Sequence, residues 1–260
     1  MHTSVFFKLF PPPKFLLMSH AGLDISDEAI RFIQYSRHGG SIVISKFGKI
    51  DLPPGLVEGG DVKDDKKFGD IVSAISKEHG ITYARISIPE EKAYLFETDV
   101  PYGDPVSISQ NIEFKLEENI PLSAQDAVFA FDLMPTSAGK PWRASVSAIP
   151  RAYVERMLQI LRGAGIVPLA FETAPRAIAR IILEGPSESA IVIHAMKHKT
   201  GIYVISGSAV GFTSTIAAAP DGDSGAYTEA LAAEARRATP TGCRGAKPPA
   251  RLSPALSWSA

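Results

Sequence analysis

The stretch Gly22-Leu23-Asp24-Ile25-Ser26 constrains the fold more than any other part of this sequence. An apolar approach ends in Gly-x-Asp, small polar residues follow, and apolar residues resume at spacing two over 30–35. Alternation with a period of two is typical of a strand that buries one face. We therefore predict a β-hairpin with Asp24 at the end of its first strand and a short polar turn after it.

Further strand and helix patterns follow in alternation along the chain. Helical spacing of apolar residues predicts helices over 64–79 with Gly80 as C-cap, from Asp104-Pro105 to Pro121, over 154–161, and after Thr173 as N-cap. Loop 52–61 is predicted to be irregular because its prolines and glycines end a strand, with Gly59-Gly60 forming a turn. The remaining strands are predicted at 41–50, 83–88, 93–98, 127–133, 143–149, 166–171, 190–195, 201–205 and 210–216.

Composition places the chain among ordinary globular proteins. Its 260 residues allow one large domain or two compact ones, with 45% hydrophobic and 21% charged residues. A formal net charge of -1 argues against a dedicated nucleic-acid-binding protein, which would usually be strongly basic. The single cysteine, Cys243, excludes an internal disulfide and fits a reducing compartment.

The two ends of the sequence differ from its middle. Residues 1–20 are apolar, but three consecutive prolines at 11–13 interrupt them, which predicts a leader that packs on the domain or stays mobile rather than a membrane span. Peripheral contact with a membrane surface is the alternative for this leader. Residues 236–260 hold five basic residues, no acidic residue and four prolines, so we predict disorder there. Either this tail is a basic interaction arm or it is not a native C-terminus, and the second interpretation is favoured.

Five pieces of the sequence occur in the same order in a known family. Together they resemble PilM, the type IV pilus assembly protein of the actin-like ATPase superfamily, which is related to FtsA. The segment ending in Glu-Asn-Ile-Pro-Leu before a strand is the most specific of them. The resemblance runs from about Ala21 to about Ile216, and its pieces are 22–25, 52–60, 86–90, 111–122 and 163–168.

The resemblance implies a mixed α/β fold with a particular domain order. It implies an actin-like (ribonuclease H-like) domain with an inserted small α+β subdomain, and a second actin-like domain that is truncated. The expected parts are a leader at 1–20, a first subdomain at 21–84 and 165–185, an inserted subdomain at 85–164, a partial second subdomain at 186–235, and the tail at 236–260.

The resemblance also implies a nucleotide site for ATP and magnesium. Its phosphate loops would contain Gly22, Asp24, Ser26 and Arg31 in the first and Thr200 in the second, with Asp24 holding magnesium through a water molecule. Three departures from the family pattern argue against hydrolysis. Ser26 replaces the glycine that lets backbone approach a phosphate, His194-Ala195-Met196 replaces Asp-x-Gly in the second loop, and the adenine-binding Gly-Gly region and closing subdomain expected next are not recognisable beyond about Glu234. Arg31 stands at the place of a phosphate-contacting lysine, a role that arginine can also fill. We therefore expect that the chain is not an enzyme.

The function implied by the resemblance is that of a cytoplasmic adaptor at the inner face of the cell membrane. Such a protein binds the N-terminal tail of a PilN-like inner-membrane protein and works with other pilus assembly proteins, with no role for nucleic acid. Its docking region would lie between the first and the inserted subdomains. Two alternatives stay open: an active actin-like ATPase of pilus assembly or cell division, and a non-functional fragment of a longer PilM-like gene.

One further cluster has a hypothetical ligand role. His194 and His198 are four residues apart beside Lys197 and Lys199, a pattern that could suggest a metal or phosphate site. Zinc sites of the His-x-x-x-His type require glutamate directly after the first histidine, on a helix. Since Ala195 follows His194 at a predicted strand end, we interpret the segment as a His- and Lys-rich turn.

Overall fold

The computed structural model describes residues 19–38, 41–134, 141–183, 188–206, 209–217 and 224–238. The chain divides into two compact units, one of Met1–Val192 with Tyr203–Thr213 and one of Ile193–Ile202 with Ser214–Ala260. Most of the expected leader, the Gly39-Gly40 turn, the 135–140 turn and residues 239–260 of the tail lie outside the described residues. None of the described helices is both long and apolar enough to cross a bilayer.

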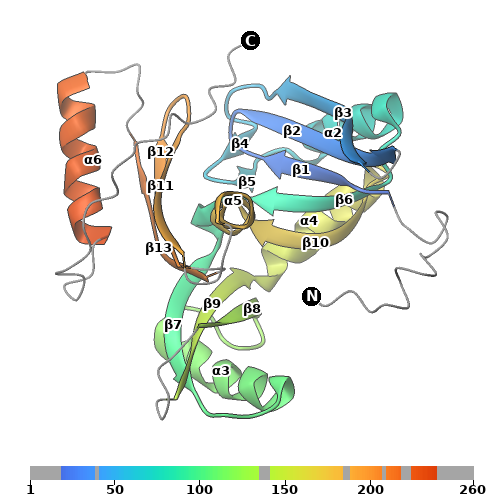
Figure 1. The fold of residues 1–260 in the computed structure, drawn as a ribbon. Coiled ribbons are helices and arrows are strands. Elements are labelled where there is room, and N and C mark those ends of the chain that lie inside the picture. Colours follow the sequence, from blue (N-terminus) through green and yellow to red (C-terminus); the bar gives the residue numbers. More distant parts are fainter. Residues whose placement is uncertain are drawn as a thin grey trace. The chain divides into compact units, whose positions relative to one another are not determined.

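A five-stranded sheet forms the centre of the first unit (Figure 1). The predicted hairpin is confirmed: β1 (Ala21–Ile25) pairs antiparallel with β2 (Ala29–His38), which pairs with β3 (Ser41–Asp51). On the other side β1 pairs parallel with β6 (Tyr83–Ile88), and β6 pairs parallel with β10 (Val167–Thr173). The order β10-β6-β1-β2-β3 therefore requires two crossover connections, because parallel neighbours cannot be joined by a tight turn.

Two helices in these crossovers bury the apolar face of the sheet. α2 (Asp65–His79) begins at the N-cap Asp64, whose carboxylate accepts from the Lys67 amide, and ends at Gly80 in the left-handed conformation, as predicted. α4 (Arg151–Gly163) lies in the second crossover. Apolar side chains from both helices join those of β1 and β6 in one core, among them Phe68, Val72, Met157, Leu161, Leu23 and Ile86.

The loop predicted at 52–61 contains a small hairpin. Its strands are only two residues each, β4 (Val57–Glu58) and β5 (Asp61–Val62), and Gly59-Gly60 turns between them. Both glycines have positive φ, 54° and 74°, which is the requirement of a tight two-residue turn that matches the twist of its strands. The turn prediction is confirmed, and the irregular-loop prediction missed the strand pairing around it.

A second sheet with one helix makes up the inserted part. It follows a single 3-10 turn η2 (Glu90–Lys92) and has the order β7-β9-β8, all antiparallel: β7 (Tyr94–Val100), β8 (Ala127–Met134) and β9 (Trp142–Pro150). α3 (Pro105–Asn119) covers one face with Ile108, Ile112 and Leu116, and Asp104 caps it as predicted. The domain boundaries stay predictions. β6 continues past residue 84, where the first subdomain was expected to end. α4, expected in the inserted subdomain, packs in the core of the five-stranded sheet.

The last described elements follow β10. α5 (Ala174–Ile182) starts after Thr173, but that hydroxyl makes no capping bond and is buried without a hydrogen-bond partner among the described residues. A three-stranded sheet then has the order β11 (Ser189–Ala195), β12 (Thr200–Ser206) and β13 (Ala209–Ile216). In the second unit, α6 (Ser224–Ala238) was not predicted. It includes Arg236 and Arg237, for which disorder was expected, so the predicted start of the disordered tail is wrong by three residues.

The left-handed end of α2 gives a stability test with an internal control. We expect Gly80→Ala to lower the free energy of unfolding by about 1 kcal/mol, because an L residue at φ 59° is strained although its Cβ would have room. Gly163→Ala at the end of α4 is the matched control, since Gly163 has no positive φ and its Cβ would meet nothing within 4 Å. Urea unfolding of both variants measures the difference. Equal stability of the two variants would contradict the capping role of Gly80.

Candidate functional site

The turn of the β1–β2 hairpin is closed by its own groups. The Ser26 amide donates to the Ala29 carbonyl at 3.1 Å, and the Ser26 hydroxyl donates to the same carbonyl at 2.9 Å. The Ala29 amide in turn donates to that hydroxyl at 3.2 Å. A serine side chain that bonds nearby backbone stabilises such a turn locally. Both the amide and the hydroxyl of Ser26 are thus engaged within the turn.

Asp24 and Arg31 face each other across this hairpin, as partners in the strand register. Arg31 Nη1 lies 3.4 Å from Asp24 Oδ2 and 3.3 Å from Ser26 Oγ, with the two charged side chains 45% and 40% exposed. The structure therefore brings three of the five predicted nucleotide-site residues together. Such an exposed ion pair contributes at most about 1 kcal/mol to stability, so it gives Asp24 a partner without fixing its side chain.

The other two predicted residues are Gly22 and Thr200. Gly22 is two residues before Asp24 on β1, and a Cβ added there would make only ordinary contacts, the nearest at 3.6 Å to Ile33 Cγ2. No close backbone approach therefore requires a glycine at this position. Thr200 belongs to the second unit, where it is fully buried and its hydroxyl donates to the Tyr227 hydroxyl at 3.3 Å.

The predicted His- and Lys-rich turn lies between β11 and β12. The Met196 amide donates to the Lys199 carbonyl at 2.9 Å and closes it, with His198 inside the turn and His194 on the strand before it. Within the described ranges, no group of three or more His, Cys, Asp or Glu side chains is arranged to hold a metal ion.

A buried pair near the hairpin was missed by the sequence analysis. Glu90 lies two residues after the end of β6 and is 7% exposed, and the hydroxyl of the fully buried Tyr203 donates to its Oε1 at 3.0 Å. Burial, with the negative charges of Glu90, Glu91 and Asp24, raises the pKa of Tyr203. Tyr203 therefore stays a proton donor near the carboxyl ends of β1 and β6.

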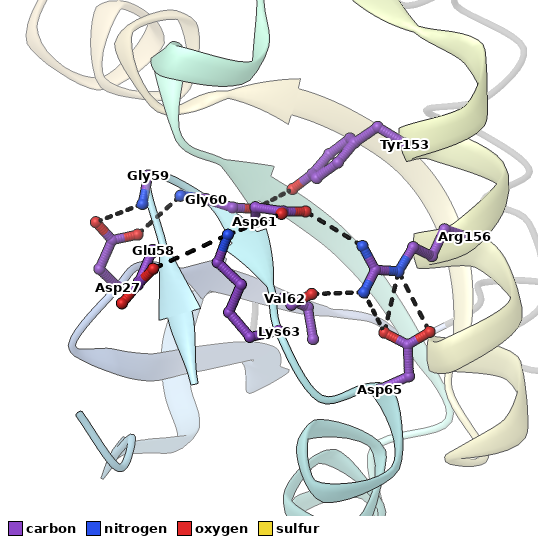
Figure 2. A network of polar contacts seen from close by, with 10 residues as sticks. All are labelled: Asp27, Glu58, Gly59, Gly60, Asp61, Val62, Lys63, Asp65, Tyr153 and Arg156. Carbon is purple, nitrogen blue, oxygen red and sulfur yellow. Dashed lines mark hydrogen bonds and ion pairs between the residues drawn. The ribbon is translucent and has the colours of Figure 1, made fainter. Parts of the chain in front are cut away.

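A polar network extends from the hairpin turn to α4 (Figure 2). Asp27, in the turn, accepts from the amides of Gly59 and Gly60 at 3.1 and 2.8 Å. The hydroxyl of Tyr153 on α4 donates to the Gly60 carbonyl at 3.1 Å. Burial raises the pKa of Tyr153, so this donor is retained at physiological pH.

Arg156, one turn later on α4, completes the network. Its Nη2 and Nε donate to the Asp65 carboxylate at 2.7 and 3.0 Å, its Nη1 donates to Asp61 at 3.2 Å, and its Nη2 also reaches the Val62 carbonyl (Figure 2). A planar guanidinium makes several such bonds in a fixed geometry. Burial opposes the charged form of Asp61, but the hydrogen bond from Lys63 and the nearby cations outweigh it and lower its pKa.

A second polar cluster joins the inserted sheet to α5. Arg176 on α5 lies 2.8 Å from Asp132 on β8 and 3.7 Å from Glu172 on β10, and Arg180 lies 2.6 Å from Glu172. Burial raises the pKa of Asp132, and the charge of Arg176 offsets this only in part. An ion pair thus crosses between the five-stranded sheet with its helices and the inserted sheet.

Known proteins share this fold. A family model described as type IV pilus assembly protein PilM matches residues 22–201 of the chain. The chain is similar to a solved structure titled "PilM-PilN type IV pilus biogenesis complex", with TM-score 0.67 and 20% identity over 85% of this chain and 70% of that one. It is also similar to the cytoplasmic domain of EpsL, an inner membrane component of the type II secretion system of Vibrio cholerae, with TM-score 0.51 and 12% identity over 76% of this chain and 71% of that one. No curated protein sequence matches the chain. The structural similarities confirm the predicted mixed α/β, actin-like fold class.

The Asp132–Arg176 pair predicts a pH-dependent loss of stability in Arg176→Met. A buried carboxyl whose pKa is raised favours folding while it is protonated and loses that contribution as pH rises through its pKa. Without Arg176 the pKa of Asp132 rises further, so the deficit against the unaltered chain should grow above pH 3.8 and reach about 2 kcal/mol near neutrality. Urea unfolding over this pH range measures the deficit.

Two further variants decide whether Asp132 is the cause. Asp132→Asn added to Arg176→Met should remove the pH-dependent part of the deficit, since no carboxylate is then left to ionise. Arg180→Met, which loses only the contact with Glu172 and is 55% exposed, should cost no more than about 0.5 kcal/mol. A deficit of the same size at pH 4 and pH 7 would contradict the assignment.

Proposed function

The chain belongs to the family of type IV pilus assembly proteins PilM, and on this premise we propose that it is an adaptor that binds a PilN-like partner and does not hydrolyse ATP. The observation that carries the proposal is the family match over residues 22–201, which spans the hairpin, the inserted sheet and α5. The family assignment predicted from the ordered sequence pieces is confirmed by the same match.

The partner is the N-terminal tail of a PilN-like inner-membrane protein. Support comes from the similar structure whose title names both PilM and PilN. A partner of this kind would place the adaptor at the inner face of the cell membrane, together with other pilus assembly proteins. Direct contact of residues 1–20 with the membrane is a further part of this proposal.

The docking region lies between the five-stranded sheet and the inserted sheet. On β8, Val128, Ala130 and Asp132 alternate with Phe129 and Phe131, which pack toward α3. The first set therefore lies on the face that Asp132 shares with Arg176, where Val128 and Ala130 are exposed. This face offers apolar and charged groups together, as a peptide site requires.

The hairpin turn supports a role without hydrolysis. Asp24 is paired with Arg31, the Ser26 hydroxyl is engaged in the turn, and Glu90 adds a second carboxylate at the same end of the sheet. Phosphates would have to be held by a turn that lacks the usual glycine and whose serine amide and hydroxyl are already hydrogen-bonded. These residues therefore fit ATP with magnesium poorly, and no chemical step through that group is derived.

Peptide binding tests the adaptor role. We expect a synthetic peptide with the N-terminal sequence of the PilN-like protein to bind the full chain, and a scrambled peptide of the same composition not to bind, as measured by isothermal titration calorimetry. Ala130→Arg should weaken binding at least tenfold, because it places a long cation on the proposed docking face. Val106→Arg on the exposed part of α3 is the matched control and should leave binding unchanged. Equal binding of both peptides, or no binding at all, would refute the role.

A nucleotide assay tests the second half of the proposal. We expect phosphate release from ATP with magnesium to stay at the buffer background, and Asp24→Ala to leave that rate unchanged. Hydrolysis above background that Asp24→Ala abolishes would establish an actin-like ATPase instead. Hydrolysis that survives Asp24→Ala would indicate a contaminating enzyme, which a second purification step would remove.

A further inference from the structure

The turn between β4 and β5 lies against both chain connections that lead into the inserted part. On the outgoing connection, a Cβ on Gly60 would come within 3.0 Å of Pro89 Cγ and Lys92 Cγ, so backbone and side chains are closely packed there. On the returning connection, the Tyr153 hydroxyl donates to the Gly60 carbonyl at 3.1 Å. One short turn therefore contacts the segments on which any movement of the inserted part would depend.

The same turn is bound to the β1–β2 hairpin on its other side. Its two positive-φ glycines direct their amides to the Asp27 carboxylate, which accepts both (Figure 2). A carboxylate that accepts two backbone amides makes a charge-assisted contact, which is stronger than a neutral one. Asp27 is three residues from Asp24, so the β4–β5 turn touches the predicted phosphate turn directly.

Helix α4 connects the inserted sheet to this turn. β9 ends at Pro150 and α4 begins at Arg151, so no loop separates the central strand of the inserted sheet from the helix (Figure 1). Arg151 also donates to the carbonyls of Gln125 and Ala127, at 2.7 and 2.9 Å, before and at the start of β8. The first turn of α4 is thereby fixed to the inserted sheet.

The second turn of α4 is fixed to the elements that flank the β4–β5 turn. Arg156 binds Asp61 and the Val62 carbonyl on β5, and Asp65 at the start of α2. Tyr153 and Arg156 are three residues apart and lie on one face of the helix. A rotation of the inserted sheet that carries α4 with it would therefore have to strain or break contacts at Gly60 or Asp61.

We propose that the β4–β5 turn, with Tyr153 and Arg156, is a positioning element that couples the orientation of the inserted part to the β1–β2 turn. This inference rests on the proposed function: a partner peptide docked against the inserted sheet changes the order of the Ser26–Ala29 turn through this element. The coupling is reciprocal, because linkage requires that a change at the hairpin alter the inserted part by the same free energy. The contacts of this element form a contiguous set, and the contribution of each to the coupling can be measured.

Hydrogen–deuterium exchange on the full chain without any partner tests the coupling. Tyr153→Phe removes one hydroxyl and its bond to Gly60, and it should speed amide exchange about fivefold at 57–62 and also at 24–29. Asp27→Asn should reciprocally speed exchange at 150–156. Arg156→Lys, which keeps the charge but loses the fork of donors, should act as Tyr153→Phe does. Glu155→Gln, on an exposed position of the same helix turn, is the control and should change none of these segments.

The outcomes separate this inference from the proposed function. Faster exchange in Tyr153→Phe confined to 57–62, with no change at 150–156 in Asp27→Asn, would overturn the coupling and leave only a local contact. In a further arm, the partner peptide should slow exchange at 24–29 in the unaltered chain and not in Tyr153→Phe, although that variant still binds it. Bound peptide that protects 24–29 equally in both would also overturn the coupling. A peptide that fails to bind the unaltered chain refutes the proposed function, while the partner-free measurements still decide the inference.

Discussion

The parallel pairing of β1 with β6 and of β6 with β10 is the constraint on which the rest of the structure depends. Parallel neighbours need a crossover, and the second crossover holds the whole inserted sheet before α4 returns the chain to β10. Both connections to the inserted sheet therefore begin or end close to the carboxyl end of β6, beside the hairpin turn of β1 and β2. The polar network around Gly60 is a consequence of this topology, since the crossover brings η2 and α4 to the same place.

Charged groups of both signs lie at this end of the sheet. Asp24, Glu90 and Glu91 supply negative charge, and Arg31 is the cation that faces Asp24 across the hairpin. The buried Glu90 is stabilised by the Tyr203 hydroxyl, whose raised pKa keeps it protonated. A buried carboxylate needs such a donor, because desolvation without one would cost several kcal/mol. The pair therefore fixes β12 against the segment after β6 and adds no attraction for an anion.

Local signals predicted most of the elements, and distant pairing explains what was missed. The capping residues Asp64, Gly80 and Asp104 lie next to the helices that they bound, so the ends of α2 and α3 could be predicted from neighbouring residues. Strands of two residues, such as β4 and β5, have no periodicity to detect. α6 was not predicted at all, and at its end the basic composition of the tail was interpreted as disorder.

The residues of the candidate site also divide into those brought together by local pairing and those brought together by distant contacts. Asp24, Ser26 and Arg31 lie within eight residues, and hairpin pairing alone was enough to bring them together. Glu90 and Tyr203 are 113 residues apart, and Arg156 is 91 residues from Asp65, so neither contact leaves a local pattern. The piece Ile86-Ser87-Ile88-Pro89-Glu90 carried a family signal without indicating that Glu90 would be buried. The contacts of such residues can be predicted only once the course of the crossover connections is known.

The hairpin turn satisfies several of its own hydrogen-bonding groups. In a phosphate loop that relies on backbone amides, the ligand satisfies donors that the turn leaves open. Here Ser26 and Ala29 satisfy each other, and Asp27 satisfies two amides of the neighbouring turn. A ligand stabilises a protein only through contacts that the free protein lacks, and this turn has already made several of them internally. Under the proposed function, these internal hydrogen bonds would supply part of the structural contribution that a bound nucleotide makes in a phosphate loop.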